Sequence, residues 1–223
     1  MTTTSRRQTS RGASSGAART KARVRRTAPA DREERIAWLP VVAGEPEDPD
    51  VRSLFERARE RLGFIPNVFK VFAARPERFK KWRTHFNEVT IGESELTPAE
   101  REMIAVAVSA ENHCLYCLTS HGAGLRQALG DQVLGDRITL DYRRAGLDER
   151  ATAMLDYAAK ITTRPVECSE ADIDRLRSLG FSDQAIWDII ETAAMYNFTN
   201  RIASASGMLP NREYHMIGRT SGD

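Results

Sequence analysis

The sequence predicts an all-α protein, and three observations support this fold class. From residue 36 onward, apolar side chains recur every three or four positions, which is the spacing of amphipathic helices. Several of these stretches begin at residues that typically start helices. No stretch alternates apolar and polar side chains between hairpin turns, as a half-buried strand does. We therefore expect a helical bundle without a sheet.

The first predicted helices lie in residues 36–95 and form an N-terminal helical layer. One helix follows Asp50 and another follows Pro76. Their apolar positions at helical spacing are Leu54, Phe55, Ala58 and Leu62 in the first, and Phe79, Trp82, Phe86 and Val89 in the second. Gly63 closes the first helix, because glycine readily adopts the left-handed conformation that ends helices.

A second group of helices is predicted in residues 96–215. Thr97 and Glu100 form a capping box with Pro98 at the first helical position, which strongly indicates a helix start. This helix turns inward Met103, Ile104, Ala107 and Val108. The two groups together form one domain over residues 35–217, since a bundle of this size buries about 70% of its unfolded surface.

Three more helices are predicted toward the C-terminus. The first carries Ala151, Met154, Leu155, Ala158 and Ile161 on one face. The second is capped by Ser169 and stops near Gly180, and the last begins at Ser182 and runs to about Ser206. On the last helix Asn197, Asn200 and Ser204 continue an apolar stripe. We expect them to satisfy one another at a subunit contact as a structural polar network, and a substrate-pocket lining is the alternative.

The N-terminal segment differs from the rest in charge. Residues 1–30 hold eight of the 33 Lys and Arg residues and none of the 31 Asp and Glu residues, so the remainder carries a net charge of −6. They contain almost no large apolar side chain, so burial cannot offset the entropy cost of ordering them. We expect residues 1–34 to form a disordered basic tail. Weak binding of nucleic acid or an anionic surface, and an organelle transit function, are the alternatives.

Composition excludes several functional classes. The chain has 41% hydrophobic and 29% charged residues, as ordinary globular proteins do. No apolar run approaches the ~18–20 residues that span a bilayer, and no secretory signal is evident. The acidic remainder also argues against a nucleic-acid-binding domain. We expect a cytoplasmic protein without a membrane partner.

The chain has three cysteines, Cys114, Cys117 and Cys168, and two of them lie three residues apart. An odd number with this spacing is not the disulfide framework of a secreted domain. In a reducing cytoplasm such a pair is more often catalytic or metal-binding. Cys168 precedes a capping serine in a predicted loop, and we expect it to be unpaired.

A histidine and a glutamate complete a candidate site around the pair. If a helix runs from Cys114 to about Leu129, then Cys114, Cys117 and His121 share one of its faces. A tight connection to the preceding helix would aim the Glu102 carboxylate at the imidazole.

These residue types suit peroxide reduction. A thiolate attacks the O–O bond and becomes a sulfenic acid, which a second thiol condenses to a disulfide. Because a free cysteine has a pKa of ~8.5, a base must take its proton. We therefore assign Glu102 as relay, His121 as base, Cys117 as attacking sulfur and Cys114 as resolving sulfur. The helix N-terminus favours a thiolate at Cys114 instead, so the choice of Cys117 depends on the adjacent histidine.

Three other interpretations stay open. The pair could bind structural zinc together with His121 and either Glu102 or Cys168. The cysteines could be small core residues, since free cysteine is commonly buried. The pair could also act without peroxide chemistry, either as a disulfide reductase or as a redox-sensing disulfide that switches an interface or a partner-binding surface.

The segment resembles the alkylhydroperoxidase D and carboxymuconolactone decarboxylase superfamily, in particular its peroxidase-related branch. The peroxidase signature of that superfamily is Glu, eleven residues, then C-x-x-C-x-x-x-H, which Glu102, Cys114, Cys117 and His121 match in register. Residues 63–69, 102–106 and 198–201 are also similar to the branch, so the resemblance covers roughly residues 36–215.

The resemblance implies an AhpD-like helical bundle that forms homo-oligomers, often trimers or their multiples. It implies Cys117 as peroxidatic sulfur, Cys114 as resolving sulfur, and His121 and Glu102 as the proton relay, with no bound cofactor or metal. The substrate is a hydroperoxide, and a partner dithiol, typically a lipoyl-bearing protein, reduces the Cys114–Cys117 disulfide. The best-known peroxidase members carry a second histidine where this chain has Tyr116. Decarboxylase members lack the cysteine pair, which disfavours lactone decarboxylation.

Overall fold

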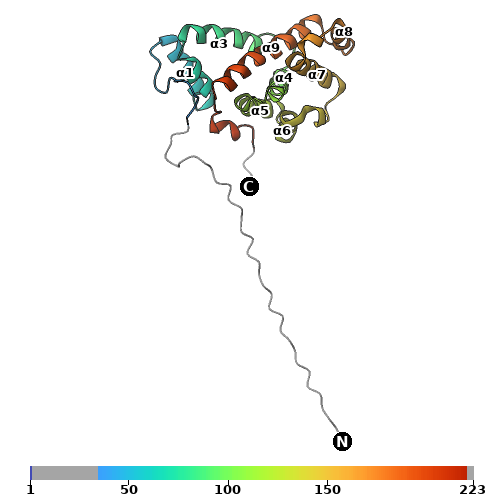
Figure 1. Cartoon of the computed structure of the whole chain (residues 1–223), viewed down its shortest axis with the longest axis horizontal. Coiled ribbons are helices and arrows are strands. Elements are labelled where there is room, and N and C mark those ends of the chain that lie inside the picture. The colour runs from blue at the N-terminus through green and yellow to red at the C-terminus, as the bar shows by residue number, and fades with distance from the viewer. Residues whose placement is uncertain (2–34, 220–223) are drawn as a thin grey trace. The chain divides into compact units, whose positions relative to one another are not determined.

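The computed structural model describes Met1 and residues 35–219, so the expectation of a disordered basic tail over residues 1–34 falls outside the described residues. Residues 35–219 contain α-helices, short 3₁₀ turns and no strand, and the all-α prediction is confirmed. The helices, shown in Figure 1, are α1 (Pro49–Leu62), α2 (Asn67–Phe72), α3 (Pro76–Ile91), α4 (Pro98–Glu111), α5 (Leu115–Leu129), α6 (Gln132–Asp141), α7 (Glu149–Thr163), α8 (Glu170–Ser178) and α9 (Asp183–Ala205). The 3₁₀ turns are η1 (Tyr142–Arg144), η2 (Pro165–Glu167) and η3 (Arg212–His215).

The helix boundaries follow local capping chemistry. Asp48 caps α1 through two backbone amides, and Gly63 ends it with a φ of 80°. Thr97 and Glu100 form the capping box of α4 that the sequence predicts. Ser182 caps α9. Two helices, α2 and α6, were not predicted, because α2 has only six residues and α6 buries only two.

Helix α4 forms the centre of the main core. Its side chains are buried on nearly every face, and Ile104, Ala105, Val106 and Val108 have no exposed surface. A helix that is apolar all round must be enclosed by others. In Figure 1 α5, α6, α7 and α9 lie around α4, and each of them contacts it. This position fixes the orientation of the α4 C-terminus, where the candidate site begins.

Helices α1, α2 and α3 form a smaller aromatic cluster. The rings of Phe69 and Phe79 lie 5.2 Å apart, and those of Phe72 and Trp82 lie 4.3 Å apart. This N-terminal layer reaches the main core where α3 runs beside α9 and Phe86 contacts Tyr196 at 6.1 Å between ring centroids. The two sequence-predicted groups of helices therefore meet along α3 and α9.

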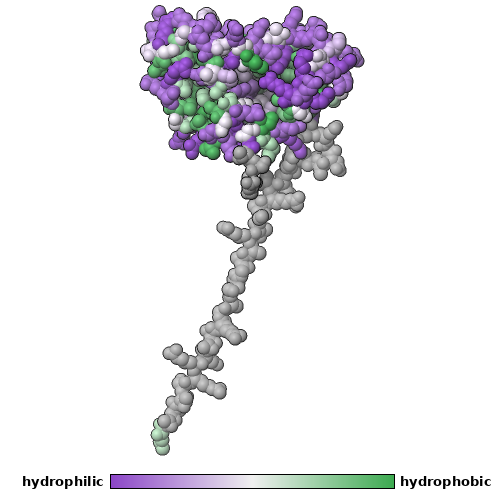
Figure 2. Space-filling view, turned by 180° about the vertical axis from the view of Figure 1, so that it is seen from behind, coloured by the Kyte–Doolittle hydropathy of each residue, from purple (hydrophilic) through white to green (hydrophobic). Residues whose placement is uncertain are grey.

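The surface of residues 35–219 is mixed. Figure 2 shows one face, on which apolar side chains are gathered in patches between hydrophilic ones. The exposed large apolar residues include Trp38, Leu115, Leu140, Trp187 and Phe198. None of the described helices has both the length and the apolar character needed to cross a bilayer.

Candidate active site

The connection between α4 and α5 places the cysteine pair. Asn112 caps the end of α4, and His113 adopts a left-handed backbone with a φ of 51°. The Asn112 side-chain amide donates to Oδ1 of Asn197 at 2.9 Å and to Oδ1 of Asn200 at 3.0 Å. Two amides of α9 therefore hold this turn, and Cys114 follows it as the N-cap of α5.

The two thiols are close together and almost completely enclosed. The Cys114 sulfur accepts the backbone N–H of Cys117 at 3.4 Å, and the Cys117 thiol donates a hydrogen bond to it. Cys114 is 1% exposed and Cys117 is 3% exposed. Both are free thiols in a small cluster with Ala203 and Met208, where the N-terminal layer, α5 and α9 meet.

Their shared hydrogen bond separates the pKa values of the two thiols. The Cys117 thiol stabilises the Cys114 thiolate, and together with the Cys117 backbone N–H and the Ser204 hydroxyl it lowers the pKa of Cys114 to about 7 despite burial. The pKa of Cys117 is raised, because its proton is held by Cys114 and because the sulfur is buried. Hydrogen bonds from Asn200 and Ser109 oppose that rise.

An oriented imidazole lies one turn along α5 from Cys117. His121 Nδ1 is 2.9 Å from Glu102 Oε2, and the two side chains are 20% and 28% exposed. An ionised carboxylate can only accept, so Nδ1 carries the proton and Nε2 is the basic nitrogen. The Tyr196 ring packs edge-on against the imidazole at 4.7 Å, and its hydroxyl lies 3.4 Å from Nδ1.

Gly124 provides the space for the Glu102 carboxylate. A Cβ atom at this position would lie 2.9 Å from the carboxyl carbon of Glu102. Such a distance is shorter than a normal van der Waals contact, so any larger residue would displace the carboxylate. The absence of a side chain at Gly124 therefore lets α4 and α5 approach closely enough for the His121–Glu102 contact.

Tyr116, between the two cysteines, has a structural environment. It is 5% exposed, and its hydroxyl accepts the backbone N–H of Val68 at 3.3 Å, at the start of α2. Its ring packs edge-on against Tyr214 at 6.4 Å. Tyr116 therefore joins α5 to the N-terminal layer and to the C-terminal segment around η3.

The structure brings Glu102 and His121 into contact, and it does the same for Cys114 and Cys117. Cys168 lies apart from them, packed on the main core between η2 and α8. Within residues 35–219 no group of three or more His, Cys, Asp or Glu side chains is arranged to hold a metal ion. The zinc interpretation therefore finds no assembled ligand set in the described part of the chain.

Two residues that contact the site were not singled out from the sequence: Tyr196 and Ser109. A signal for Tyr196 exists, because it lies four residues before Asn200 and shares its helix face. The expected polar network is present and lies within one chain, since Asn197 and Asn200 accept from the α4 cap and Asn200 donates to Ser109 at 3.0 Å.

The fold and the site together define a class of protein: an all-helical domain with a C-x-x-C thiol pair at a helix start and a His–Glu pair one turn further along. Comparison with known families agrees with this class. The carboxymuconolactone decarboxylase family profile matches residues 77–133, a stretch that contains Glu102, Cys114, Cys117 and His121. No curated protein matched the chain.

Solved structures give a closer comparison. An uncharacterized peroxidase-related protein from Silicibacter sp. TM1040 is 46% identical, with a TM-score of 0.75 over 81% of this chain and 96% of that one. An uncharacterized peroxidase-related protein from Ralstonia eutropha JMP134, described as an alkylhydroperoxidase AhpD core, is 37% identical, with a TM-score of 0.80 over 84% and 99%. The debrominase Bmp8 shares the fold alone, at 17% identity and a TM-score of 0.69 over 80% and 95%.

The chain belongs to the alkylhydroperoxidase D and carboxymuconolactone decarboxylase superfamily, in its peroxidase-related branch. The family resemblance expected from the signature residues is confirmed. Membership covers more than one activity, because the superfamily contains decarboxylases as well as peroxidase-related proteins, and a debrominase has the same fold.

Proposed function

We propose that this protein is a thiol-dependent hydroperoxide reductase that cycles between a Cys114–Cys117 dithiol and disulfide. The supporting observation is the enclosed, hydrogen-bonded thiol pair at the start of α5 with a carboxylate-oriented imidazole one turn further along. The peroxidase-related names of the Silicibacter and Ralstonia structures agree with it.

The reaction transfers two electrons from the dithiol to the peroxide. The Cys117 thiolate attacks the terminal oxygen, the O–O bond breaks, and the alkoxide takes a proton to leave as alcohol, so Cys117 becomes a sulfenic acid. The Cys114 thiolate then attacks the Cys117 sulfur, the S–O bond breaks, and hydroxide takes the second proton to leave as water. The two protons originate from the two thiols, and His121 Nε2 accepts and returns them with Glu102 holding the ring.

The separated pKa values suit these two roles. Cys114, with a pKa of about 7, is a thiolate for much of the time at neutral pH and is ready to resolve the sulfenic acid. A thiolate of higher pKa is intrinsically more nucleophilic, which suits Cys117 once its proton is removed. The lower pKa of Cys114 also makes it the better leaving group when a reductant attacks the disulfide at Cys117.

Regeneration requires a dithiol that supplies two electrons. By analogy with the family we propose a protein dithiol, such as a lipoyl group, in a reducing compartment such as the cytoplasm, and we propose a homo-oligomeric assembly. No cofactor is needed, because the electrons pass through sulfur alone.

The decisive experiment is single-turnover oxidation of the reduced, metal-free protein by cumene hydroperoxide. Free thiols are counted before and after the reaction. The protein carries the Cys168→Ser substitution, so that Cys114 and Cys117 are the only thiols counted. We expect rapid loss of two thiols, located at Cys114 and Cys117 by peptide mapping. Thiol loss no faster than that of an ordinary cysteine would contradict the proposal. A disulfide that forms but gives no repeated turnover with dithiothreitol would instead support a redox sensor.

Single-cysteine variants test the assignment of the two sulfurs. Cys117→Ser should abolish peroxide consumption, because it removes the attacking sulfur. Cys114→Ser should consume one equivalent of peroxide and stop as a sulfenic acid, which dimedone traps and mass spectrometry detects. Equal residual turnover in both variants, or a trapped sulfenic acid at Cys114 in Cys117→Ser, would reject this assignment.

A further inference from the structure

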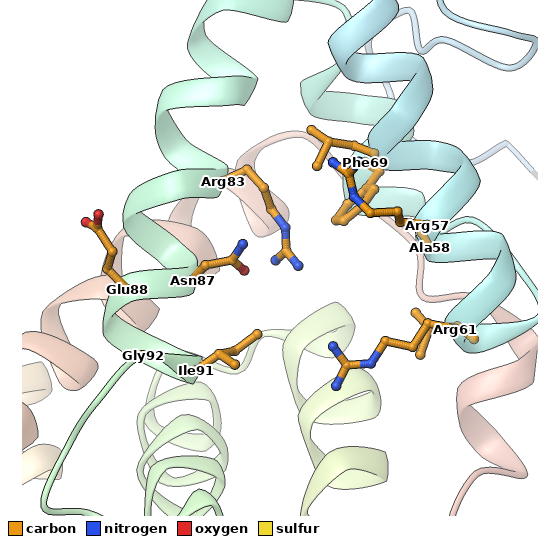
Figure 3. Close-up of a pocket in the computed structure, with 11 residues that line it drawn as sticks. Arg57, Ala58, Arg61, Phe69, Arg83, Asn87, Glu88, Ile91 and Gly92 are labelled. Carbon is orange, nitrogen blue, oxygen red and sulfur yellow. The ribbon is translucent and has the colours of Figure 1, made fainter.

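A cavity of about 720 Å³ opens between α1 and α3, and its lining contains none of the residues of the proposed mechanism. Its volume falls within the ~300–1,000 Å³ typical of small-molecule sites. Figure 3 shows α1 on one side and α3 on the other. Most of the lining is apolar and includes Leu54, Leu62, Phe69 and Ile91.

The charged lining is almost entirely positive. Arg57, Arg61 and Arg83 all line the cavity, and in Figure 3 the guanidinium groups of Arg61 and Arg83 point into it from opposite sides. Glu88, the one acidic residue of the lining, points away in the same view and lies 3.8 Å from the His85 imidazole.

None of these three arginines forms an ion pair within residues 35–219. Arg57 donates only to the Ser53 hydroxyl, at 2.5 Å. The Nε atom of Arg83 and the Oδ1 atom of Asn87 are buried without a hydrogen-bond partner. Burial, together with the charges of Arg61 and Arg57, lowers the pKa of Arg83. A cluster of like charges around a partly buried guanidinium whose Nε has no partner is unfavourable unless an anion completes it.

Aromatic contacts connect this cluster to the candidate site. The Arg83 guanidinium lies 5.1 Å from the centre of the Phe69 ring and 5.7 Å from that of Phe86. Phe86 contacts Tyr196 at 6.1 Å, and Tyr196 packs against His121 at 4.7 Å. A molecule held at Arg83 therefore lies against the side chains that lead to the imidazole.

We propose that this cavity binds an organic anion with an apolar body, whose carboxylate or phosphate is held by Arg61 and Arg83 with Arg57 at the rim. If the protein has the proposed function, its substrate class is the hydroperoxide of an amphipathic acid, and this part of the inference rests on that function. Arginine suits the anion because its planar fork pairs with two oxygens at once. The aliphatic and aromatic lining suits the chain.

Binding of unreactive probes tests the cavity independently of any turnover. Decanoate, decyl phosphate and decanol have the same chain length and differ in the head group, and isothermal titration gives their affinities for the reduced protein. We expect both anions to bind at least about tenfold more tightly than decanol, with a preference that falls as salt rises. The ratio of the two anion affinities identifies the preferred head group, and inorganic phosphate tests whether the head group alone suffices. Equal affinity for decanol and decanoate would overturn the proposal.

Variants on the two helices locate the site. Arg83→Gln and Arg61→Gln should each reduce the anion preference, and the exposed Arg61 gives a variant that does not disturb the interior. Arg78→Gln, an exposed arginine of α3 outside the cavity, is the matched control and should retain the full preference. A preference that survives in the Arg61→Gln, Arg83→Gln double variant would also overturn the proposal.

Substrate selectivity is measured separately. We compare kcat/KM for a fatty-acid hydroperoxide with kcat/KM for the neutral cumene hydroperoxide. In Arg61→Gln the ratio of the two should fall, because the KM for the fatty-acid hydroperoxide rises. In Arg78→Gln the ratio should stay unchanged. Inactivity with both peroxides would reject the proposed reductase and leave the anion site standing on the binding data. Activity with both peroxides but no change of the ratio in Arg61→Gln would reject the amphipathic acid as substrate.

Discussion

The hydrogen bond between the Cys114 and Cys117 sulfurs gives two identical side chains different proton affinities. In the reduced Cys168→Ser protein, thiolate absorbance at 240 nm should rise with an inflection near pH 7, the pKa of Cys114. Cys117→Ala removes the largest cause of that lowered pKa, so the inflection should move upward. The rate of disulfide formation should fall as pH drops below about 7. An unchanged inflection in Cys117→Ala would show that the helix amide and Ser204 suffice.

The lowered pKa of Cys114 also makes the free energy of unfolding depend on pH. The Cys114 pKa in the folded protein lies below that of an unfolded cysteine, so the folded state favours the thiolate. This contribution is fully present above the unfolded pKa and is lost as pH falls through about 7. The raised pKa of Cys117 acts with the opposite sign, but only above the unfolded pKa of about 8.5. Acidification from about pH 8.5 to below 7 should therefore weaken the reduced protein slightly more than the oxidised one, in which no thiol titrates at this site.

Gly124 gives a second test at the level of single residues. Gly124→Ala should leave the fold intact or more stable by up to about 1 kcal/mol, because alanine favours helix. The added methyl group displaces the Glu102 carboxylate, and the rate of peroxide reduction should fall about tenfold. This loss is smaller than the ~10²–10⁴-fold that a general base contributes, because His121 itself remains. Gly122→Ala, on the same helix but facing Thr139, is the control and should keep its activity. Equal activity in both variants would remove Glu102 from the mechanism.

At the scale of elements, the α4–α5 connection depends on one left-handed residue. His113 has a φ of 51° and is exposed, so its side chain adds little packing. His113→Val should destabilise the protein by about 1–2 kcal/mol, because a branched side chain fits this conformation poorly. His113→Asn should be close to neutral, since asparagine tolerates it. Thermal unfolding compares the two, and equal melting temperatures would mean that the turn relaxes without strain.

Elements with a cap and a long apolar stripe could be predicted from the sequence, and shorter ones could not. The capping box at Thr97 predicted where α4 begins, and Gly63 predicted where α1 ends, because capping depends on neighbouring residues alone. Helix α6 escaped detection because Gly135 and Ile138 alone are buried, which gives too few apolar positions for a period.

The candidate site was partly predictable for the same reason. The four signature residues lie on two consecutive helices, so a single turn decides their proximity. The contact of Tyr196 with His121 and the arginine cavity depend on packing between different helices, α9 with α5 in the first and α1 with α3 in the second. Spacing along one helix carries no information about such pairs.

At the scale of the whole molecule, a buried cation anchors the C-terminal segment. Arg126 of α5 is 5% exposed and donates to the Asp136 carboxylate at 3.1 Å, to the Tyr214 carbonyl at 3.1 Å and to the Ile217 carbonyl at 3.0 Å. It thereby ties α5 and α6 to the segment that places Tyr214 on Tyr116. The Asp136 carboxylate also pairs with the more exposed Arg219.

Asp136→Ala should destabilise the protein by about 2 kcal/mol, less than the ~3–5 kcal/mol of a fully buried pair because Asp136 is 36% exposed. Arg219→Gln removes the exposed partner of the same carboxylate and should cost less than about 1 kcal/mol. Urea unfolding of the two variants measures both values. A cost for Arg219→Gln as large as that for Asp136→Ala would show that the outer pair, and not the buried one, holds the segment.

The near-complete enclosure of the two sulfurs has a consequence for the return half of the cycle. A mixed disulfide with any incoming thiol needs room beside Cys117, which is 3% exposed and belongs to a buried cluster with Ala203 and Met208. Only the terminal oxygen of a hydroperoxide has to reach the Cys117 sulfur, whereas a mixed disulfide places a second sulfur and its carbon chain against it. Oxidation and reduction therefore have different spatial requirements, and the frequency with which this cluster opens sets an upper limit on how fast the disulfide is returned to the dithiol, whichever thiol supplies the electrons.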